Sequence, residues 1–355
     1  MRSCLDEIDF PMIQKRFDAF WRREVLDRPV VQIAAPRKEQ KQPDFAVPDT
    51  TLGRWLDIEY QVKAHELAVE NTLYLGDAFP SYYPNLGPDS FTAFLGAELR
   101  FVDDLTSWVV PFVDDLSEWE PSLDPRNRWW RLMLEMMDAT CQAGRGRYLV
   151  GIPDLHGGGD ALAAARHPDR LALDLYDKPG EVKRLMRRMT QIYIEVYDAY
   201  LARTSRVQKG STTWLPVYSR GRYNALQNDF SGLSSPAMFR EFFLEDIVRL
   251  AEYLDNSIYH LDGPIALGNL DDLLSIEALD GIQWVPGAGA KPMSEWVKVC
   301  RRVLEAGKCL HITCAPAEVE LLLSQLPHGG LCIRTGCSSE EEARTLLRKV
   351  QSARH

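Results

Sequence analysis

The sequence lacks the features that would direct it to a membrane, a nucleic acid or an oxidising compartment. No apolar run approaches the roughly 20 residues that a membrane-spanning helix needs. Acidic residues outnumber basic ones by 51 to 41, giving a formal net charge of −10, whereas nucleic-acid binding requires a basic face. The seven cysteines are odd in number and have no paired spacing, which is typical of reduced thiols. We therefore expect a cytoplasmic protein with neither a membrane nor a nucleic-acid partner.

Segments typical of buried strands alternate with segments typical of helices along most of the chain. We expect strands near residues 30–36, 79–84, 148–153, 211–217, 257–264, 281–286, 308–313 and 330–335. This alternation predicts a parallel sheet with right-handed crossovers. Eight strands is the number found in a (β/α)₈ barrel.

The predicted fold class is therefore α/β, a TIM barrel formed by residues 1–355 as a single domain. It carries an N-terminal helical extension at about residues 10–26. Residues 91–125 contain short β-like runs broken by Asp-Asp pairs, and we expect them to form a β excursion, such as a hairpin, over one end of the core.

The segment Ser257–Pro264 shows how one strand is expected to leave the core. It begins as a buried strand and ends in polar residues followed by Gly263 and Pro264. His260 and Asp262 are two residues apart, so both side chains leave an extended segment on the same side. An imidazole beside a carboxylate at a strand end is a candidate site. The alternative is a core imidazole with an aspartate that caps the next turn.

In a TIM barrel the active site lies at the C-terminal ends of the strands, which groups residues that are distant in sequence. We expect Asp154, Asp229 and Asp262 to be catalytic. Substrate-binding residues are predicted to be Asn85, His156, Tyr218, Trp284 and His311. Each of these assignments depends on the barrel.

Two loops in this set have simpler alternatives. The glycine-rich loop Leu155–Asp160 lacks the Lys-Ser/Thr of a P-loop and the spacing of a dinucleotide fingerprint. We interpret it as a close backbone approach to a ligand, with Asp160 as the helix N-cap. Asp229 precedes Ser235 and Pro236, which explain the next helix start by themselves. A solvated loop carboxylate is the alternative for Asp229.

Cys337 lies just beyond the last predicted strand and before a helix N-terminus, where a thiolate is favoured. Together with His260 and Asp262 it would form a nitrogen, oxygen and sulfur ligand set with an open position. That set is typical of catalytic zinc. The competing expectation is that Asp262 accepts a hydrogen bond from a loop amide while Cys337 stays protonated.

Several of these motifs together resemble a known family. They are the segment Asp229–Phe242, the His260-x-Asp262-Gly263 strand end, the Gly336-Cys337 pair and the opening segment Phe20–Val30. They resemble the uroporphyrinogen decarboxylase superfamily, and within it the branch of corrinoid- and thiol-linked methyltransferases. The resemblance runs from about residue 15 to the end and implies a single (β/α)₈ barrel.

The resemblance also implies a chemistry. In the methyltransferase branch a His-x-Cys pair and a distant Cys hold zinc, which activates a thiol to take a methyl group from a corrinoid protein. His260 and Cys337 match two of these positions, whereas Asp262, a harder ligand, stands where the second Cys is expected. The decarboxylase proper fits less well, because the first strand is followed by a single Arg37 and a Lys/Gln-rich loop.

These observations lead to a first hypothesis and two alternatives. The first is a metal-assisted methyltransferase-like enzyme that transfers a methyl group between a corrinoid protein, or a small methyl donor, and a thiol or similar acceptor. The second is a metal-free barrel lyase or decarboxylase-like enzyme that uses His260, Asp262 and Asp229 in acid–base chemistry. The third is a non-catalytic protein that binds a corrinoid or a corrinoid protein.

Overall fold

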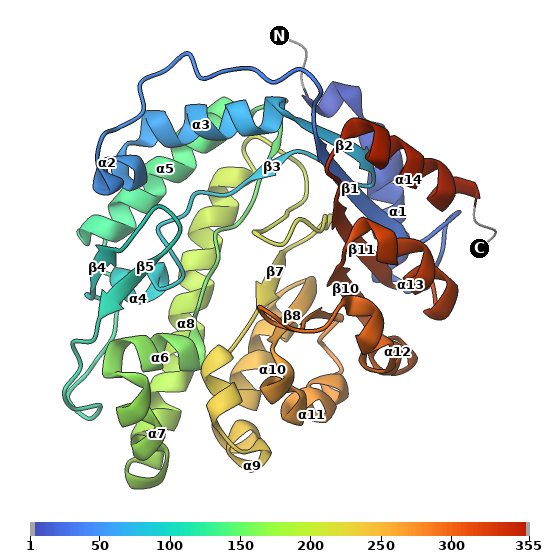
Figure 1. The fold of residues 1–355 in the computed structure, drawn as a ribbon. Coiled ribbons are helices and arrows are strands. Elements are labelled where there is room, and N and C mark those ends of the chain that lie inside the picture. Colours follow the sequence, from blue (N-terminus) through green and yellow to red (C-terminus); the bar gives the residue numbers. More distant parts are fainter. Residues whose placement is uncertain (1–3, 353–355) are drawn as a thin grey trace.

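A computed structural model describes residues 4–352, and its centre is a seven-stranded sheet (Figure 1). The strand order is β2-β1-β11-β10-β9-β8-β7. The bounds are β1 Val30–Pro36, β2 Thr72–Gly76, β7 Tyr223–Leu226, β8 Asn256–Asp262, β9 Gly281–Val285, β10 Cys309–Thr313 and β11 Leu331–Gly336. All neighbours are parallel except β1 and β2, which are antiparallel. The expected α/β fold with a mostly parallel central sheet is confirmed.

Helices connect and cover these strands. Their bounds are α1 Phe10–Trp21, α2 Thr51–Leu56, α3 Ile58–Glu70, α4 Ser90–Phe94, α5 Arg128–Gly144, α6 Gly158–Arg166, α7 Pro168–Asp177, α8 Pro179–Thr204, α9 Pro236–Met238, α10 Leu244–Tyr253, α11 Leu270–Ser275, α12 Val297–Glu305, α13 Val319–Gln325 and α14 Glu340–Ser352. From β7 to β11, helices connect each strand to its parallel neighbour. α12 packs on β9 and β10, and α14 packs on β1 and β2.

Most of the expected strand order is present. The segments near residues 258, 283, 310, 332 and 30 are successive parallel neighbours. Two further strands, β3 Ser81–Tyr82 and β6 Leu149–Val150, form a separate parallel pair. A single parallel bridge joins Ile152 to Thr213. Among the described strands, β2 and β7 remain edges of the main sheet. A closed eight-stranded barrel is therefore not confirmed.

The prediction of a strand at residues 211–217 is wrong. Ser211 forms an isolated antiparallel bridge with Ser219, and the strand beside β8 is instead β7. Pro216 has no N–H to donate to a ladder, which disfavours a central strand in this segment. The segment packs with α1 in a second, smaller core that includes Leu215, Val217 and Tyr218.

The N-terminal half departs from the sequence predictions in smaller ways. α1 ends at Trp21 rather than near Leu26, and the helix expected from about 51 to 72 is broken into α2 and α3 at Asp57, which caps α3. The β excursion is confirmed as an antiparallel hairpin of β4 Glu98–Phe101 and β5 Ser107–Val110. Within residues 4–352 no helix combines the length and the apolar character needed to cross a membrane.

Candidate functional site

Polar side chains from the loops after β6 and β7 meet at the C-terminal ends of these strands. Gln227, directly after β7, donates a hydrogen bond from Nε2 to Asp154 Oδ1 at 3.2 Å. The second oxygen of Asp154, Oδ2, lies 3.1 Å from His156 Nε2. Two loops separated by more than 70 residues are thus joined through one carboxylate. Two residues expected in the site, Asp154 and His156, are in direct contact.

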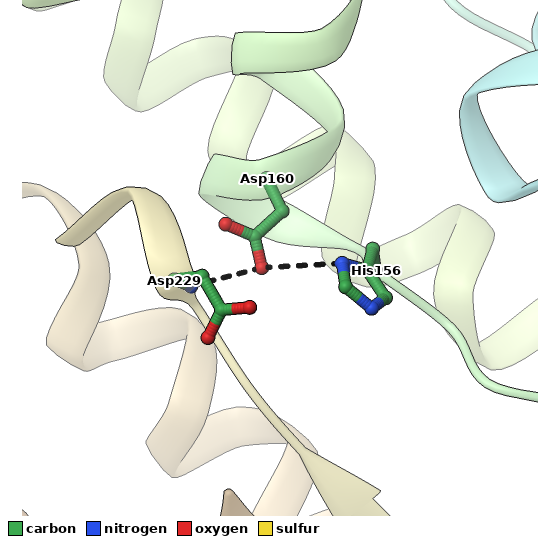
Figure 2. A group of neighbouring side chains, drawn as sticks. All are labelled: His156, Asp160 and Asp229. Atoms are coloured by element: carbon green, nitrogen blue, oxygen red, sulfur yellow. Dashed lines mark hydrogen bonds and ion pairs between the residues drawn. The ribbon is translucent and has the colours of Figure 1, made fainter. Parts of the chain in front are cut away.

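Asp160 holds the loop that carries Asp229. Its carboxylate accepts hydrogen bonds from the main-chain N–H groups of Asp229 at 3.0 Å and Phe230 at 2.8 Å. The expectation that Asp160 caps its own helix is wrong, because Gly157 is the N-cap of α6 and Asp160 lies within the first turn. Figure 2 shows the Asp160 carboxylate between the His156 ring and the backbone of Asp229.

His156, Asp160 and Asp229 form a three-ligand group, which we call the acid–imidazole cluster. One ligand atom of each residue lies within 4.8 Å of the other two, and this is the one such group of His, Cys, Asp and Glu found over residues 4–352. His156 Nδ1 is 4.0 Å from Asp160 Oδ2 (Figure 2). Two carboxylate oxygens and one imidazole nitrogen are suitable ligands for a divalent cation.

Burial and mutual charge shift the protonation of the cluster. Burial by itself would lower the pKa of His156, but the charge and hydrogen bond of Asp154, with Asp160 and Asp229, raise it to about 9. Burial raises the pKa of Asp160 to about 6, against the opposing effect of His156. The pKa of Asp229 is also raised, by burial first, although His260 and His156 oppose the shift. The cluster therefore favours a charged imidazole between carboxylates, one of which is close to accepting a proton.

His260 and Asp262 on β8 lie within electrostatic reach of this cluster, since the charges of both act on the pKa of Asp229. His260 Nδ1 lies 2.7 Å from Gln283 Oε1 on the neighbouring β9. The His260 ring also packs edge-on against Trp214, with ring centroids 5.3 Å apart. The structure thus brings Asp154, His156, Asp229, His260 and Asp262 to one end of the strands.

Cys337, the third residue expected to hold zinc, is a core residue. Its side chain is 6 % exposed and belongs to the main hydrophobic core. Burial raises the pKa of its thiol, and Glu342 adds to the shift. His260, Asp262 and Cys337 are not among the groups whose ligand atoms all lie within 4.8 Å of one another. The residues expected to hold zinc therefore do not form a metal-binding geometry, and the expected thiolate is a buried thiol.

Two expected substrate-binding residues lie elsewhere in the molecule. Tyr218 comes before β7 in the chain, whereas Asp229 follows the C-terminal end of that strand. The Tyr218 hydroxyl accepts a hydrogen bond from Gln14 of α1 at 2.8 Å. Trp284 is fully buried and packs against Trp296 with centroids 5.2 Å apart. Among the described residues, neither side chain has a hydrogen bond or ring contact with Asp154, His156, Asp160 or Asp229.

The other two expected substrate-binding residues are Asn85 and His311. Asn85 accepts a hydrogen bond from the Gly87 N–H at 2.8 Å and lines a cavity of about 460 Å³ with Tyr82 and Tyr83. His311 is fully buried, and neither of its ring nitrogens has a hydrogen-bond partner. Burial, followed by Arg334 and His260, lowers the pKa of His311 to about 3. His311 is therefore a neutral imidazole.

Sequence reasoning missed Gln227, Gln283 and Arg334, and it gave Asp160 the wrong partner. The signal for Gln283 and Arg334 was available, since each is a polar residue within an otherwise apolar strand. Register places Gln283 opposite both His260 and His311, so these side chains share one face of the sheet. No local pattern identifies the partner of Asp160, because the N–H groups that it binds are about 70 residues away.

Comparison with solved structures places the whole chain in a known architecture. The fold is similar to that of a methyltransferase from Methanosarcina mazei, with a TM-score of 0.63 and 13% sequence identity. The match covers 96% of this chain and 98% of that chain. At this identity the similarity shows the fold alone. No family model matches the sequence, and no curated protein matches it.

Proposed function

We propose that this protein is a methyltransferase-like enzyme that acts on a small molecule bound over the C-terminal ends of the parallel strands. The observation that carries the proposal is the convergence of Asp229 with His156, Asp160, His260 and Asp262. The fold similarity to a methyltransferase over almost the full chain supports it. Paired carboxylates and imidazoles with shifted pKa values at strand ends are typical of an active site.

Asp229 is the proposed general base. In the transfer, the acceptor X–H loses its proton to the carboxylate, a bond forms between X and the methyl carbon, and the donor leaves with the electron pair of its broken bond to that carbon. A raised pKa makes a carboxylate a better proton acceptor near neutral pH. Asp160 fixes the backbone of Asp229, while the charged His156 balances the surrounding carboxylates.

A divalent cation at the acid–imidazole cluster is a further part of the proposal, and zinc is the first ion to test. His156, Asp160 and one oxygen of Asp229 would hold it, which leaves the other oxygen of Asp229 to accept the proton, and the ion would supply a Lewis acid next to the acceptor. Binding requires His156 to lose its proton, so affinity is expected to rise with pH. His260, Asp262 and Cys337 do not fit a zinc ion together, and no step is assigned to zinc at that position.

The proposed methyl donor is a corrinoid carried by a partner protein or a small methylated molecule, and the proposed acceptor is a thiol or similar nucleophile. The test uses protein purified without chelator, methylcobalamin as donor and a panel of small thiols. The readouts are loss of methylcobalamin absorbance, the mass of the methylated product and bound zinc per chain. We expect turnover in the wild type and at least a 100-fold lower rate in Asp229→Asn.

Asp177→Asn is the matched control, because Asp177 is an exposed aspartate at the end of α7. It should leave both rate and metal content unchanged. Absence of methyl transfer with every donor and acceptor pair, from folded protein, contradicts the proposed function. Equal zinc content in wild type and His156→Gln contradicts the metal part alone.

One observation favours a metal-free lyase or decarboxylase-like enzyme as the second candidate. The acid–imidazole cluster contains no sulfur ligand and already pairs a charged His156 with Asp154. Such an enzyme would turn over its substrate without a methyl donor and would keep its activity in the presence of chelator. Corrinoid binding without turnover of any substrate would instead support a non-catalytic binding protein.

A further inference from the structure

Gln283 lies between two histidines on one face of the sheet. It belongs to β9, where it is opposite His260 of β8 on one side and His311 of β10 on the other. Residues in register on neighbouring parallel strands direct their side chains to the same face. Gln283 is 6% exposed, so its amide is enclosed with an imidazole ring on each side. The contacts of this one amide therefore decide which of the two rings is held.

The amide oxygen of Gln283 is bonded to His260 and not to His311. His260 Nδ1 lies 2.7 Å from Gln283 Oε1, whereas both ring nitrogens of His311 are buried without a partner among residues 4–352. An amide oxygen accepts hydrogen bonds and cannot donate them, so His260 Nδ1 carries a proton in this contact. Because a neutral imidazole has a single N–H, the Nε2 atom of neutral His260 then holds a lone pair.

The second nitrogen of His260 is accessible. In the part of the chain that the structure describes, the contact with Gln283 is the one hydrogen bond of the His260 side chain. His260 is only partly buried, and its Nε2 is not among the buried polar atoms that lack a partner, which separates it from both nitrogens of His311. The charge of His260 also acts on Asp229, the proposed base. Nε2 is therefore open to a molecule bound at the strand ends.

Trp214 restricts the same ring from a second direction. The indole of Trp214 and the imidazole of His260 meet at 82° with centroids 5.3 Å apart, an edge-to-face arrangement. The hydrogen bond to Gln283 opposes rotation of the imidazole, and the indole packed against the ring opposes it as well. A base in an active site is oriented in this way, since a third group holds one ring nitrogen while the other faces the substrate.

We propose that Gln283 is a positioning residue, which holds His260 in the Nδ1–H tautomer and so presents the Nε2 lone pair to the substrate. Nε2 accepts a hydrogen bond from an N–H, O–H or S–H group of that molecule. When Nε2 takes the proton, the ring becomes a cation with an N–H at each nitrogen, and Gln283 Oε1 still accepts from Nδ1. The same oxygen thus serves both forms of the ring. The catalytic consequence rests on the proposed function, whereas the tautomer is measurable without turnover.

The tautomer is measured by NMR on the full-length protein with ¹⁵N in histidine alone. The chain has 7 histidines, and the spectrum of His260→Gln identifies the His260 signals by their loss. At a pH where the ring is neutral, we expect the wild type to show Nδ1 as the protonated nitrogen. Gln283→Leu removes the acceptor, so the protonated and unprotonated shifts should exchange between Nδ1 and Nε2. Gln283→Glu keeps an oxygen in the same place and should retain the Nδ1–H form.

Gln142→Leu is the matched control, because Gln142 is exposed on α5, outside the sheet. It should leave the His260 signals as they are in the wild type. Circular dichroism verifies that each variant is folded, and the wild-type and Gln283→Glu spectra decide the question if Gln283→Leu is not. A wild-type His260 protonated at Nε2 overturns the proposal, because the Gln283 amide would then donate to the ring. An unchanged tautomer in folded Gln283→Leu overturns it too.

The methyl-transfer assay gives the second readout. Gln283→Leu should lower kcat/KM by at least about tenfold, because the wrong tautomer offers an N–H where a lone pair is needed. Gln283→Glu should lose less activity, and Gln142→Leu none. The expected tautomers without any methyl transfer support the positioning role of Gln283 and contradict the proposed methyl transfer. Methyl transfer at the wild-type rate in folded Gln283→Leu overturns the positioning role and supports the proposed function.

Discussion

The carboxylate of Asp160 is hydrogen-bonded to the main-chain N–H of Asp229 at 3.0 Å and also accepts the N–H of Phe230. This contact ties the first turn of α6 to the loop after β7. The Asp229 side chain is therefore positioned by a residue about 70 positions away. The placement of Asp229, the proposed base, therefore depends on the buried carboxylate of Asp160.

We predict that Asp160→Asn loosens this loop and lowers turnover. An amide offers one oxygen where the carboxylate offers two, so one buried N–H loses its acceptor at a cost of about 1–3 kcal/mol. Hydrogen exchange should accelerate at the amides of Asp229 and Phe230, with kcat reduced more than KM is changed. Asp177→Asn should alter neither. Unchanged exchange at both amides contradicts the positioning role of Asp160.

Stability should depend on the protonation of His156. Its pKa in the folded protein, about 9, lies above the ordinary value of 6.5. The charged form therefore stabilises the fold fully below pH 6.5, and this contribution disappears as the pH rises through 9. The expected loss is about 3 kcal/mol at most. Denaturant unfolding at pH 6 and pH 9.5 should show a smaller difference in His156→Gln than in the wild type, and an equal difference would disprove this assignment.

The ionisation of Asp246 should also make the folded protein less stable as the pH rises, for a different reason. It is buried beside Thr190, with which it shares a hydrogen bond, and burial raises its pKa from 3.8 to about 7. A carboxyl with a raised folded pKa binds its proton more tightly in the folded protein, so stability falls as the pH rises from about 4 through 7.

Asp246→Asn removes that ionisation. We expect the variant to be close to wild type at pH 5 and more stable at pH 8, by up to about 4 kcal/mol. Thermal unfolding at the two pH values measures this difference. A variant that is less stable than wild type at pH 8 would show that the carboxylate is needed in its charged form.

The Asp77 carboxylate supports the start of the sheet. It is fully buried, pairs with Arg28 and with Arg16 at 3.0 Å, and accepts the Val31 N–H of β1 at 2.9 Å. Asp77→Asn leaves a buried guanidinium without its counter-charge, for which we expect a loss of about 3–5 kcal/mol. Asp27→Asn, which removes the half-exposed partner of Arg16, should cost less than about 1 kcal/mol. If Asp77→Asn and Asp27→Asn lower the free energy of unfolding in urea by the same amount, the buried pair does not contribute more than the half-exposed one.

The sequence determined the elements whose local pattern agrees with their final surroundings. Five strands are short, largely apolar and separated by helices, so their type and their parallel order could be predicted from the sequence. They are Val30–Pro36, Asn256–Asp262 and the three strands that follow β8. The two-residue spacing of His260 and Asp262 also predicted that both side chains leave the strand on the same side, because side chains alternate along a strand. In the structure the charges of both act on Asp229.

Tertiary structure decided what an apolar pattern leaves open. Residues 211–217 resemble a strand, yet Pro216 and the packing against α1 favour an irregular segment, and β7 pairs with β8 instead. Cys337 and Trp284 follow predicted strands or lie in them, but their side chains enter the core. Shifting the register of a strand by one residue moves each of its side chains to the opposite face of the sheet. Amino-acid composition does not determine that register.

The acid–imidazole cluster shows the same limit most directly. Asp160 finds its partners about 70 residues away. Local sequence specifies residue types and periodicity, which act over a few positions. Hydrogen bonds and buried charges depend on chain segments that only folding brings together, so the chemistry of the site is a property of the tertiary structure.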